Sequence, residues 1–216
     1  FIRCSVRDSL PETVGERVPA DVGAGCTSFA IQPKSTLDGH PISGQTKDTG
    51  LGRAMQFVVL RMKMTDAPSV LTLTYPGWLY GHGFIEGGCA IFRNSLFAGA
   101  GGGKLPYVVW GLLALHCPTV EEVEKLTRDQ GVRSASHCTV ADNHGGVLGI
   151  EIGKGGIGKC RPKYGIYTHA NAAVSGKRLM KHEEEHKSFT RENSLHREMR
   201  LRERLKPERG RITAQT

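Results

Sequence analysis

Cys26 is the residue of this sequence whose surroundings most favour chemistry. It stands in G-A-G-C-T-S-F-A-I-Q at residues 23–32, where three residues with almost no side chain precede it and two hydroxyl residues follow it. A nucleophile with small backbone neighbours fits this setting, because glycine permits bends that a Cβ would obstruct. A buried packing cysteine fits it as well. The stretch alone leaves both interpretations open.

A second candidate for chemistry is the run H-E-E-E-H that begins at His182. It matches H-E-x-x-H, in which two histidines one helical turn apart bind zinc and a glutamate acts as base, here His182, His186 and Glu183. The nearest residues that could supply a third ligand are Glu192 and His196. Because charged pairs four residues apart are common on solvated helices, we predict a charged surface segment and keep a zinc-dependent hydrolase as an alternative.

Length and composition favour one globular domain. With 216 residues, 38% of them hydrophobic, and 28 glycines, the chain can bury a sizeable core and form many tight turns. The longest apolar stretch, around residues 107–115, is too short to span a membrane, and residues 1–25 lack a signal-peptide pattern. We therefore expect a cytoplasmic protein without a membrane partner. Six scattered cysteines without a C-x-x-C pair favour free thiols.

The formal net charge of +8 is concentrated near the C-terminal end. Residues 177–211 contain 12 Lys and Arg against 7 Asp and Glu, so this segment supplies +5 of the total. A nucleic-acid partner would use such a charge. The interleaved glutamates and the lack of an aromatic stacking platform favour a solvated amphipathic helix instead, so we do not expect nucleic-acid binding.

The pattern of apolar residues and turn residues predicts the elements that must position these side chains. Strands are predicted at residues 29–32, 40–45, 57–64, 69–75, 88–93, 137–141, 147–152 and 165–170. Helices are predicted at residues 106–116, at 119–129, where T-V-E-E matches a capping box, and at 191–206. Strands grouped before, between and after helices indicate an α+β fold with antiparallel sheets.

Six short motifs occur one after another between residues 25 and 205, and the ordered set is more specific than any one of them. They are G-C-T-S-F-A at 25–30, G-Q-T-K-D at 44–48, G-C-A-I-F-R-N-S-L at 88–96, S-H-C-T-V-A-D at 136–142 with G-I-E at 149–151, T-H-A-N at 168–171 and S-L-H-R-E-M-R-L at 194–201. This ordered set resembles the acyl-coenzyme A:6-aminopenicillanic acid acyltransferase family, peptidase family C45. That family belongs to the N-terminal nucleophile (Ntn) hydrolases and is more distantly similar to choloylglycine hydrolases.

The resemblance implies a four-layer αββα sandwich, with the nucleophile at the tip of an inner strand. It also implies self-cleavage between Gly25 and Cys26, so that residues 1–25 end the upstream pro region and residues 26–216 form a partial core with a basic helix at about 191–206. Family members have a longer chain upstream and further strands downstream. We therefore expect an internal fragment whose sandwich is incomplete at both ends and whose own activity is in question.

The resemblance also implies a mechanism for Cys26. A strained peptide at Gly25 would favour self-cleavage, because a residue without Cβ tolerates strain best. The matured Cys26 would carry a thiol and a free α-amine, whose reference pKa near 8 suits a general base. An amide substrate would acylate the thiol, and water or an amine would then take the acyl group. The expected activity is that of an amide-bond hydrolase or acyltransferase working through a thioester.

Four further residues match motif positions of the family. Asn171 and Asn94 would bind an oxyanion or the substrate, Asp48 would orient the protonated α-amine, and Arg197 would reach back toward the nucleophile. Each also has an ordinary alternative, such as a turn, a cap or an exposed helix arginine. One departure is Ala172, since the family usually has histidine after the asparagine of this motif.

The expected partners are a small-molecule amide or acyl-CoA-like substrate and the protein's own upstream chain, without cofactor or metal. The aromatic stretch W-L-Y-G-H-G-F at residues 78–84 would line an acyl pocket or pack in the core. The alternative function is a non-catalytic truncated copy or a basic binding module that keeps the fold without activity.

Overall fold

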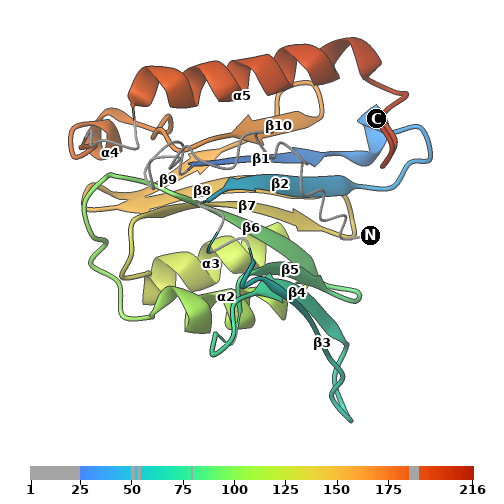
Figure 1. Ribbon diagram of the computed structural model, residues 1–216, viewed down its shortest axis with the longest axis horizontal. Helices are drawn as coiled ribbons and strands as arrows, with labels where there is room; N and C mark the ends of the chain where they lie inside the picture. Colours follow the sequence, from blue (N-terminus) through green and yellow to red (C-terminus); the bar gives the residue numbers. More distant parts are fainter. Residues whose placement is uncertain (1–24, 50–51, 53–54, 79, 185–189) are drawn as a thin grey trace, which may run out of the picture.

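Two antiparallel sheets stacked face to face form the body of the protein (Figure 1). The computed structural model describes residues 25–49, 52, 55–78, 80–184 and 190–216, and the statements below concern these residues. The smaller sheet has the order β10-β1-β2 and consists of β1 (Gly25–Ile31), β2 (Ile42–Asp48) and β10 (Ile166–His169). The first residues of β1 pair with β2 alone, because pairing with β10 starts at Ser28.

The larger sheet has seven strands in sequence order. They are β3 (Val58–Met62), β4 (Val70–Thr74), β5 (His82–Ile85), β6 (Cys89–Ser95), β7 (Ser136–Asp142), β8 (Val147–Gly153) and β9 (Gly156–Cys160). All neighbouring strands in this sheet are antiparallel. Between β6 and β7 the chain forms two helices, and the other connections are at most seven residues long.

Helices cover the outer faces of both sheets (Figure 1). On the larger sheet lie α2 (Tyr107–Leu115) and α3 (Val120–Gln130), and α5 (Arg191–Leu205) lies across the smaller sheet. A short helix, α4 (Lys177–Met180), precedes α5. The order of layers is therefore helix, sheet, sheet, helix, and the α+β class expected from the sequence is confirmed.

Strands β7 and β8 are at the centre of the molecule. Every residue of both strands is buried, because one face packs on α2 and α3 while the other faces the smaller sheet. Burial of both faces explains why β8 lacks the apolar–polar alternation of a half-exposed strand. The neighbouring strand β7 also buries polar side chains: Ser136, His137, Thr139 and Asp142. The main core between sheet and helices includes Trp110, Leu115 and Leu148. Glu151, in the middle of β8, is the charged exception on this strand and is discussed below.

Local signals in the sequence account for most elements. Thr119 caps α3 by accepting a hydrogen bond from the Glu122 N–H, as T-V-E-E predicts. Thr190 caps α5 in the same way through the N–H of Asn193. The predictions missed β5, β9 and α4. Glycines interrupt the side-chain pattern of both strands, whose extended form depends on pairing with their neighbours.

Gly149, in β8, lies directly against a side chain of the smaller sheet. An ideal Cβ at this position would stand 1.8 Å from the hydroxyl oxygen of Tyr167, which belongs to β10 in the other sheet. Tyr167 is itself buried, and its hydroxyl group is hydrogen-bonded to Nε2 of His137 at 2.8 Å. A side chain at Gly149 would therefore push the sheets apart.

We predict that Gly149→Ala lowers the free energy of unfolding by about 1–3 kcal/mol, the usual effect of overpacking a core. Gly102→Ala is the matched control, because no atom lies within 4 Å of its ideal Cβ. Urea denaturation of both variants measures the difference. Equal stability of the two variants would show that the sheets are not in close contact at this point.

Candidate active site

Cys26 is the second residue of β1, the central strand of the smaller sheet. In the β1–β2 pairing, Cys26 lies opposite Lys47 and Gly25 lies opposite Asp48. The hairpin predicted from the turn residues thus brings Asp48 next to the peptide bond that precedes the cysteine. Since β10 pairs only from Ser28 onward, the other edge of β1 is open at Cys26.

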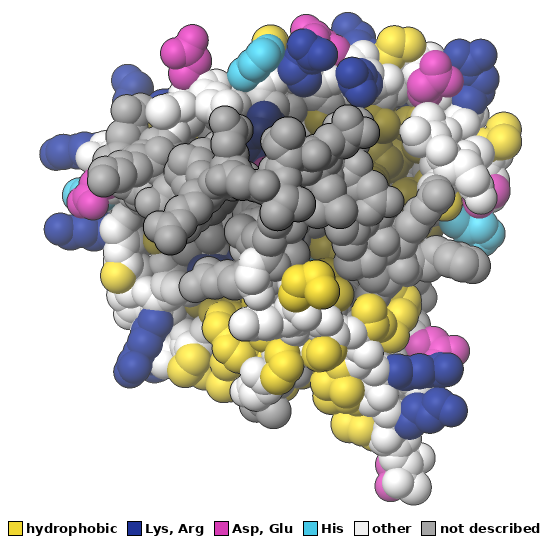
Figure 2. Space-filling view, in the orientation of Figure 1, with side chains coloured by type: hydrophobic (Ala, Val, Ile, Leu, Met, Phe, Trp, Pro, Cys, Tyr) yellow, Lys and Arg dark blue, Asp and Glu magenta, His cyan; other side chains and the backbone are white. Residues whose placement is uncertain are grey.

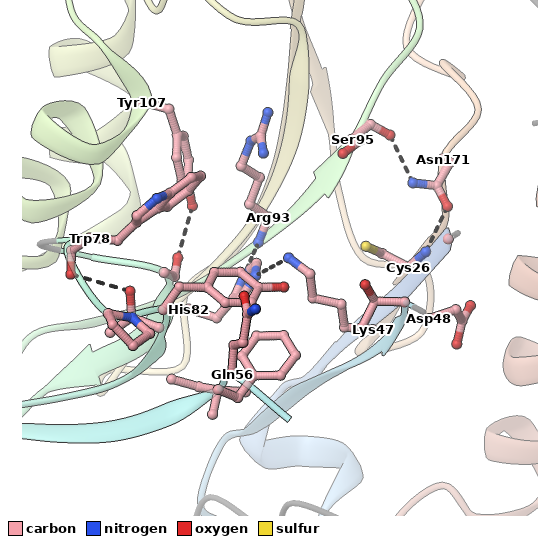
Figure 3. A pocket seen from close by; sticks show the side chains of 18 of the residues that line it. Cys26, Lys47, Asp48, Gln56, Trp78, His82, Arg93, Ser95, Tyr107 and Asn171 are labelled. Carbon is pink, nitrogen blue, oxygen red and sulfur yellow. Dashed lines mark hydrogen bonds between the residues drawn. The ribbon is translucent and has the colours of Figure 1, made fainter. Parts of the chain in front are cut away.

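Asn171 occupies that open edge of β1. The backbone N–H of Cys26 donates a hydrogen bond of 2.8 Å to Oδ1 of Asn171, and Nδ2 of Asn171 donates one of 2.8 Å to the carbonyl oxygen of Ser95 (Figure 3). The backbone N–H of Asn171 in turn donates to Oγ of Ser194, on α5, at 2.6 Å. One side-chain amide therefore ties the start of β1 to the end of β6, which belongs to the other sheet.

The thiol of Cys26 is buried, with 6% of the residue exposed. Burial raises the pKa of this thiol, while the positive charge of Lys47 and a hydrogen bond from the Ser95 backbone act in the opposite direction. The net effect keeps sulfur in the thiol form at neutral pH. Attack by this sulfur therefore requires a base that removes its proton.

Arg197 reaches from α5 to the backbone of β1. Its Nη1 donates to the carbonyl oxygen of Cys26 and to Oγ1 of Thr27, both at 2.8 Å, and its Nη2 donates to Oδ1 of Asn171 at 3.0 Å. A further bond from Nε to Asn193 aligns the side chain along the helix. Arg197 is therefore not an ordinary solvated helix arginine, which was the alternative interpretation of the sequence.

Gly25 lies between two charged side chains. An ideal Cβ at Gly25 would stand 3.1 Å from Oδ2 of Asp48 and 3.1 Å from Nη2 of Arg197. The strained peptide expected between Gly25 and Cys26 stays a prediction. The need for glycine here comes from the close approach of the two side chains.

Asn94 lies within the stacked sheets and does not line the cavity beside Cys26. Its Nδ2 donates to the carbonyl oxygens of His169 and Ala170, at 3.1 and 2.7 Å, and its Oδ1 accepts from Gln45. Both amide hydrogens are thus bonded to the backbone just before Asn171. The predicted direct contact with an oxyanion does not fit this arrangement, because no amide hydrogen of Asn94 remains for it.

A buried carboxylate, that of Glu151, supports the segment around Asn171. Glu151 is fully buried and lies 2.7 Å from Nε2 of His169, and it also accepts hydrogen bonds from the backbone N–H groups of Val174 and Ser175. Burial opposes ionisation of Glu151, but the bonds from His169 and Ser175 outweigh it and hold the pKa of Glu151 below its ordinary value. The sequence contained this residue in G-I-E but gave no sign of its partners.

A cavity of about 620 Å³ extends from Cys26 between the sheets. Among the residues that line it, Figure 3 shows Lys47, His82 and Arg93 on one side of Cys26 and Asp48 on the other. Aromatic side chains form much of its remaining wall: Phe57, Tyr75, Trp78 and Tyr107. The aromatic stretch noted in the sequence therefore divides between two roles, since Tyr80 is fully buried in the main core.

Residues 182–184, the described part of the H-E-E-E-H run, contribute to the packing of the chain. The side chain of Glu183 is buried, accepts a hydrogen bond of 2.6 Å from the Ala173 N–H and forms an ion pair with Arg191. The prediction of a fully solvated charged segment is therefore wrong for Glu183. His186 lies outside the described residues. Within the described ranges, no group of three or more His, Cys, Asp or Glu is arranged to hold a metal ion.

Comparison with protein families identifies the chain. The family model for acyl-coenzyme A:6-aminopenicillanic acid acyl-transferase matches residues 61–212. The chain belongs to this family. The matched range includes Asn94, Asn171 and Arg197, whereas Cys26 and Asp48 precede it. Comparison with proteins of curated function gives no match.

Solved structures of Ntn hydrolases resemble this fold. A mutant conjugated bile acid hydrolase from Clostridium perfringens has 16% identity and a TM-score of 0.52, over 69% of this chain and 54% of that chain. A second variant of that hydrolase has 15% identity, the same coverage and a TM-score of 0.46. Penicillin V acylase from Agrobacterium tumefaciens has 14% identity and a TM-score of 0.39, over 68% of this chain and 45% of that one. The chain thus matches about half the length of each.

At these identities the first of the matches shows the fold alone. It agrees with the two stacked antiparallel sheets described above. None of the helices in the described part of the chain combines the length and hydrophobicity needed to cross a bilayer. The family match therefore assigns the chain to the acyl-transferase family, and the first structural match has a similar fold.

We predict that the buried carboxylate of Glu151 makes the stability of the protein depend on pH. Because the folded protein holds the pKa of Glu151 below its unfolded value of about 4.3, its stabilising effect is full above that value and is lost as the pH falls through the lowered folded pKa. Glu151→Gln should destabilise the protein at neutral pH by about 3–5 kcal/mol and reduce the loss of stability in acid.

Urea denaturation between pH 3 and pH 7 measures both effects. Glu203→Gln is the control, because Glu203 is exposed on α5. If Glu151→Gln and Glu203→Gln have the same stability and the same pH dependence as the unmodified protein, Glu151 does not hold the segment around Asn171.

Proposed function

We propose that the protein is an amide-bond hydrolase or acyltransferase in which Cys26 is the nucleophile after self-cleavage between Gly25 and Cys26. The observation that carries the proposal is the hydrogen bond from the Cys26 N–H to Asn171, beside a buried thiol that lines a cavity. Family membership supports the class of reaction. In this proposal residues 1–25 are the upstream part and residues 26–216 form the catalytic chain.

Self-cleavage begins when the thiol of Cys26 loses its proton and attacks the carbonyl carbon of Gly25. The C–S bond forms, the C–N bond of the peptide breaks, and nitrogen takes a proton, which gives a thioester and a free α-amine. Water then hydrolyses the thioester and leaves a carboxyl group on Gly25. Asp48 and Arg197 flank Gly25 and are placed to stabilise the charges that form there.

The matured Cys26 then contains both nucleophile and base. Asn171 Oδ1, which accepts from the backbone N–H of Cys26, would accept from the free amine and hold it in place. An α-amine has a pKa of about 8, so near neutral pH it can take the proton of the thiol. The raised pKa of the buried thiol is consistent with the need for this base.

An oxyanion forms when the thiolate attacks a substrate carbonyl. Asn171 Nδ2 donates one hydrogen to Ser95, and its second hydrogen can serve the oxyanion in the cavity. Loss of one such donor costs about 3–4 kcal/mol in other enzymes. Asn94 has a positioning role in this account, because it fixes the carbonyl groups of His169 and Ala170.

The acyl-enzyme can react with water or with an amine, so hydrolysis and transfer share every step up to the thioester. A small-molecule amide or an acyl-CoA-like thioester would acylate Cys26 in this proposal. A truncated copy that keeps the fold without activity is the competing interpretation. The two differ in whether the chain cleaves itself and forms an acyl-enzyme.

We predict that Cys26→Ala abolishes both self-cleavage and amide turnover, because the variant has no sulfur to form the thioester. Intact mass of the protein expressed with residues 1–25 should reveal a chain that begins at Cys26, and no such chain in the variant. Cys160→Ala is the control, since Cys160 lies at the far strand β9. Cleavage or turnover that survives in Cys26→Ala would contradict the proposal.

A second prediction concerns Gly25→Val. Its branched side chain would displace Asp48 and Arg197, so self-cleavage should slow on the order of tenfold to a hundredfold, equivalent to about 1–3 kcal/mol of strain. The rate at which a chain with N-terminal cysteine appears measures the effect, and Gly102→Val is the control. An unchanged rate in Gly25→Val, with normal thermal unfolding of the uncut form, would show that the space at Gly25 is irrelevant to cleavage.

A further inference from the structure

We propose that Gln45, in β2, is a positioning residue for the reaction at Cys26. Its side-chain amide holds the end of β6 and the side chain of Asn94, and through both it places Asn171. The effect on turnover rests on the proposed function. The structural part, a link from Gln45 to the contact between Cys26 and Asn171, can be measured without any turnover.

The end of β6 has an open edge that side chains occupy. Pairing with β5 ends at Ile91, so no described strand follows this edge farther. Nε2 of Gln45 donates a hydrogen bond of 2.5 Å to the carbonyl oxygen of Arg93. Two residues farther on, the carbonyl oxygen of Ser95 accepts one from Nδ2 of Asn171 (Figure 3). Gln45 and Asn171 thus act as neighbouring substitutes for strand pairing.

The second hydrogen of the Gln45 amide fixes the orientation of Asn94. Nε2 of Gln45 donates to Oδ1 of Asn94 at 2.6 Å. Both hydrogens of Asn94 Nδ2 go to the carbonyl oxygens of His169 and Ala170. An amide turned end over end would set Oδ1 against these two oxygens and its NH₂ group against that of Gln45. The donor from Gln45 therefore selects the orientation that holds the chain just before Asn171.

The position of Gln45 requires a hydrogen-bond donor. Both atoms bonded to its Nε2 are oxygens, so a carboxylate of the same shape would meet two acceptors. Gln45 is half-buried and lies opposite the fully buried Ser28, which directs its side chain between the sheets. Figure 2 shows Lys, Arg, Asp and Glu side chains around the rim of the visible face, where water screens them. A charge at position 45 would lack that screening.

The effect of Gln45 ends at the reacting residue. Asn171 accepts from the backbone N–H of Cys26, and the Ser95 backbone forms a hydrogen bond with the Cys26 thiol. Displacement of the end of β6 would therefore disturb the thiol and its neighbour Asn171 together. Gln45 itself is not among the residues that line the cavity. Its loss should impair the reaction step and leave substrate binding nearly unchanged.

The first test replaces the donor by an acceptor of the same shape. Gln45→Glu should lower kcat for pentanoyl anilide by about tenfold or more and change KM by less than about twofold. Gln32→Glu is the matched control, because Gln32 is also half-buried and its Nε2 donates to the carbonyl oxygen of Gly145 at 3.1 Å, beyond the far end of β1. An equal loss of kcat in both variants, or a higher KM with unchanged kcat, would overturn the inference.

A double variant tests whether Gln45 acts through Asn94. Gln45→Met keeps the length of the side chain but has no donor, and it introduces no charge that could prevent folding. Combined with Asn94→Ala, it should lower kcat by about threefold or more less than the product of the two single losses. A loss equal to the full product would show that Gln45 acts independently of Asn94 and would overturn the inference.

Hydrogen exchange measures the structural part. In Cys26→Ala the backbone N–H of residue 26 remains, with its partner Asn171. Its exchange should become faster by about tenfold or more when Gln45→Glu is added, and stay within about twofold when Gln32→Glu is added. The buried amide of Ile150 is the reference for opening of the whole fold. Equal acceleration at residue 26 and at Ile150 would mean general destabilisation and would overturn the inference.

The two kinds of measurement separate this inference from the proposed function. If the unmodified protein neither cleaves itself nor turns over an amide, while Gln45→Glu selectively accelerates exchange at residue 26, the proposed function fails and the positioning role of Gln45 stands. If exchange at residue 26 is unchanged in Gln45→Glu, the positioning role fails, even in a protein that cleaves itself and is active.

Discussion

The hydrogen bond between the Cys26 backbone N–H and Asn171 is the contact on which the site depends. It replaces strand pairing at the open edge of β1, so the position of Cys26 is set by a side chain instead of a third strand. Arg197 donates to the same amide oxygen and to the Cys26 carbonyl oxygen. A residue held on both sides of its backbone can remain in place when the bond before it is broken, which is what the proposed N-terminal nucleophile requires.

The buried polar groups between the sheets serve that contact. Asn94 binds the carbonyl groups just before Asn171, and Glu151 binds the backbone just after it. Such groups are costly to bury unless they are fully bonded, so they specify one arrangement of the two sheets. Ala172, at the position where histidine was expected, is buried, and the contacts that hold Asn171 come instead from Ser95, Ser194 and Arg197.

The sequence predicted what local patterns determine. The β1–β2 hairpin, the capped helix α3 and the strands β7 and β8 each follow from turn, cap or hydrophobic signals within a few residues. Contacts between distant segments could not be predicted. Asn94 and Asn171 had the same expected role but have different neighbours, and Glu151 meets His169 only in the folded chain. The reason for a glycine at position 25 could be found only in the folded structure, because the two side chains that flank it, Asp48 and Arg197, come from other elements.

The central claim is that one residue supplies both the thiol and the amine. It is tested most directly by the mass of the protein after rapid acid quench during turnover of an amide substrate, followed by mapping of the acylated peptide. The account predicts an acyl group on sulfur in a peptide whose first residue is Cys26. An acyl group on any other residue, or on a Cys26 still joined to Gly25, would contradict it.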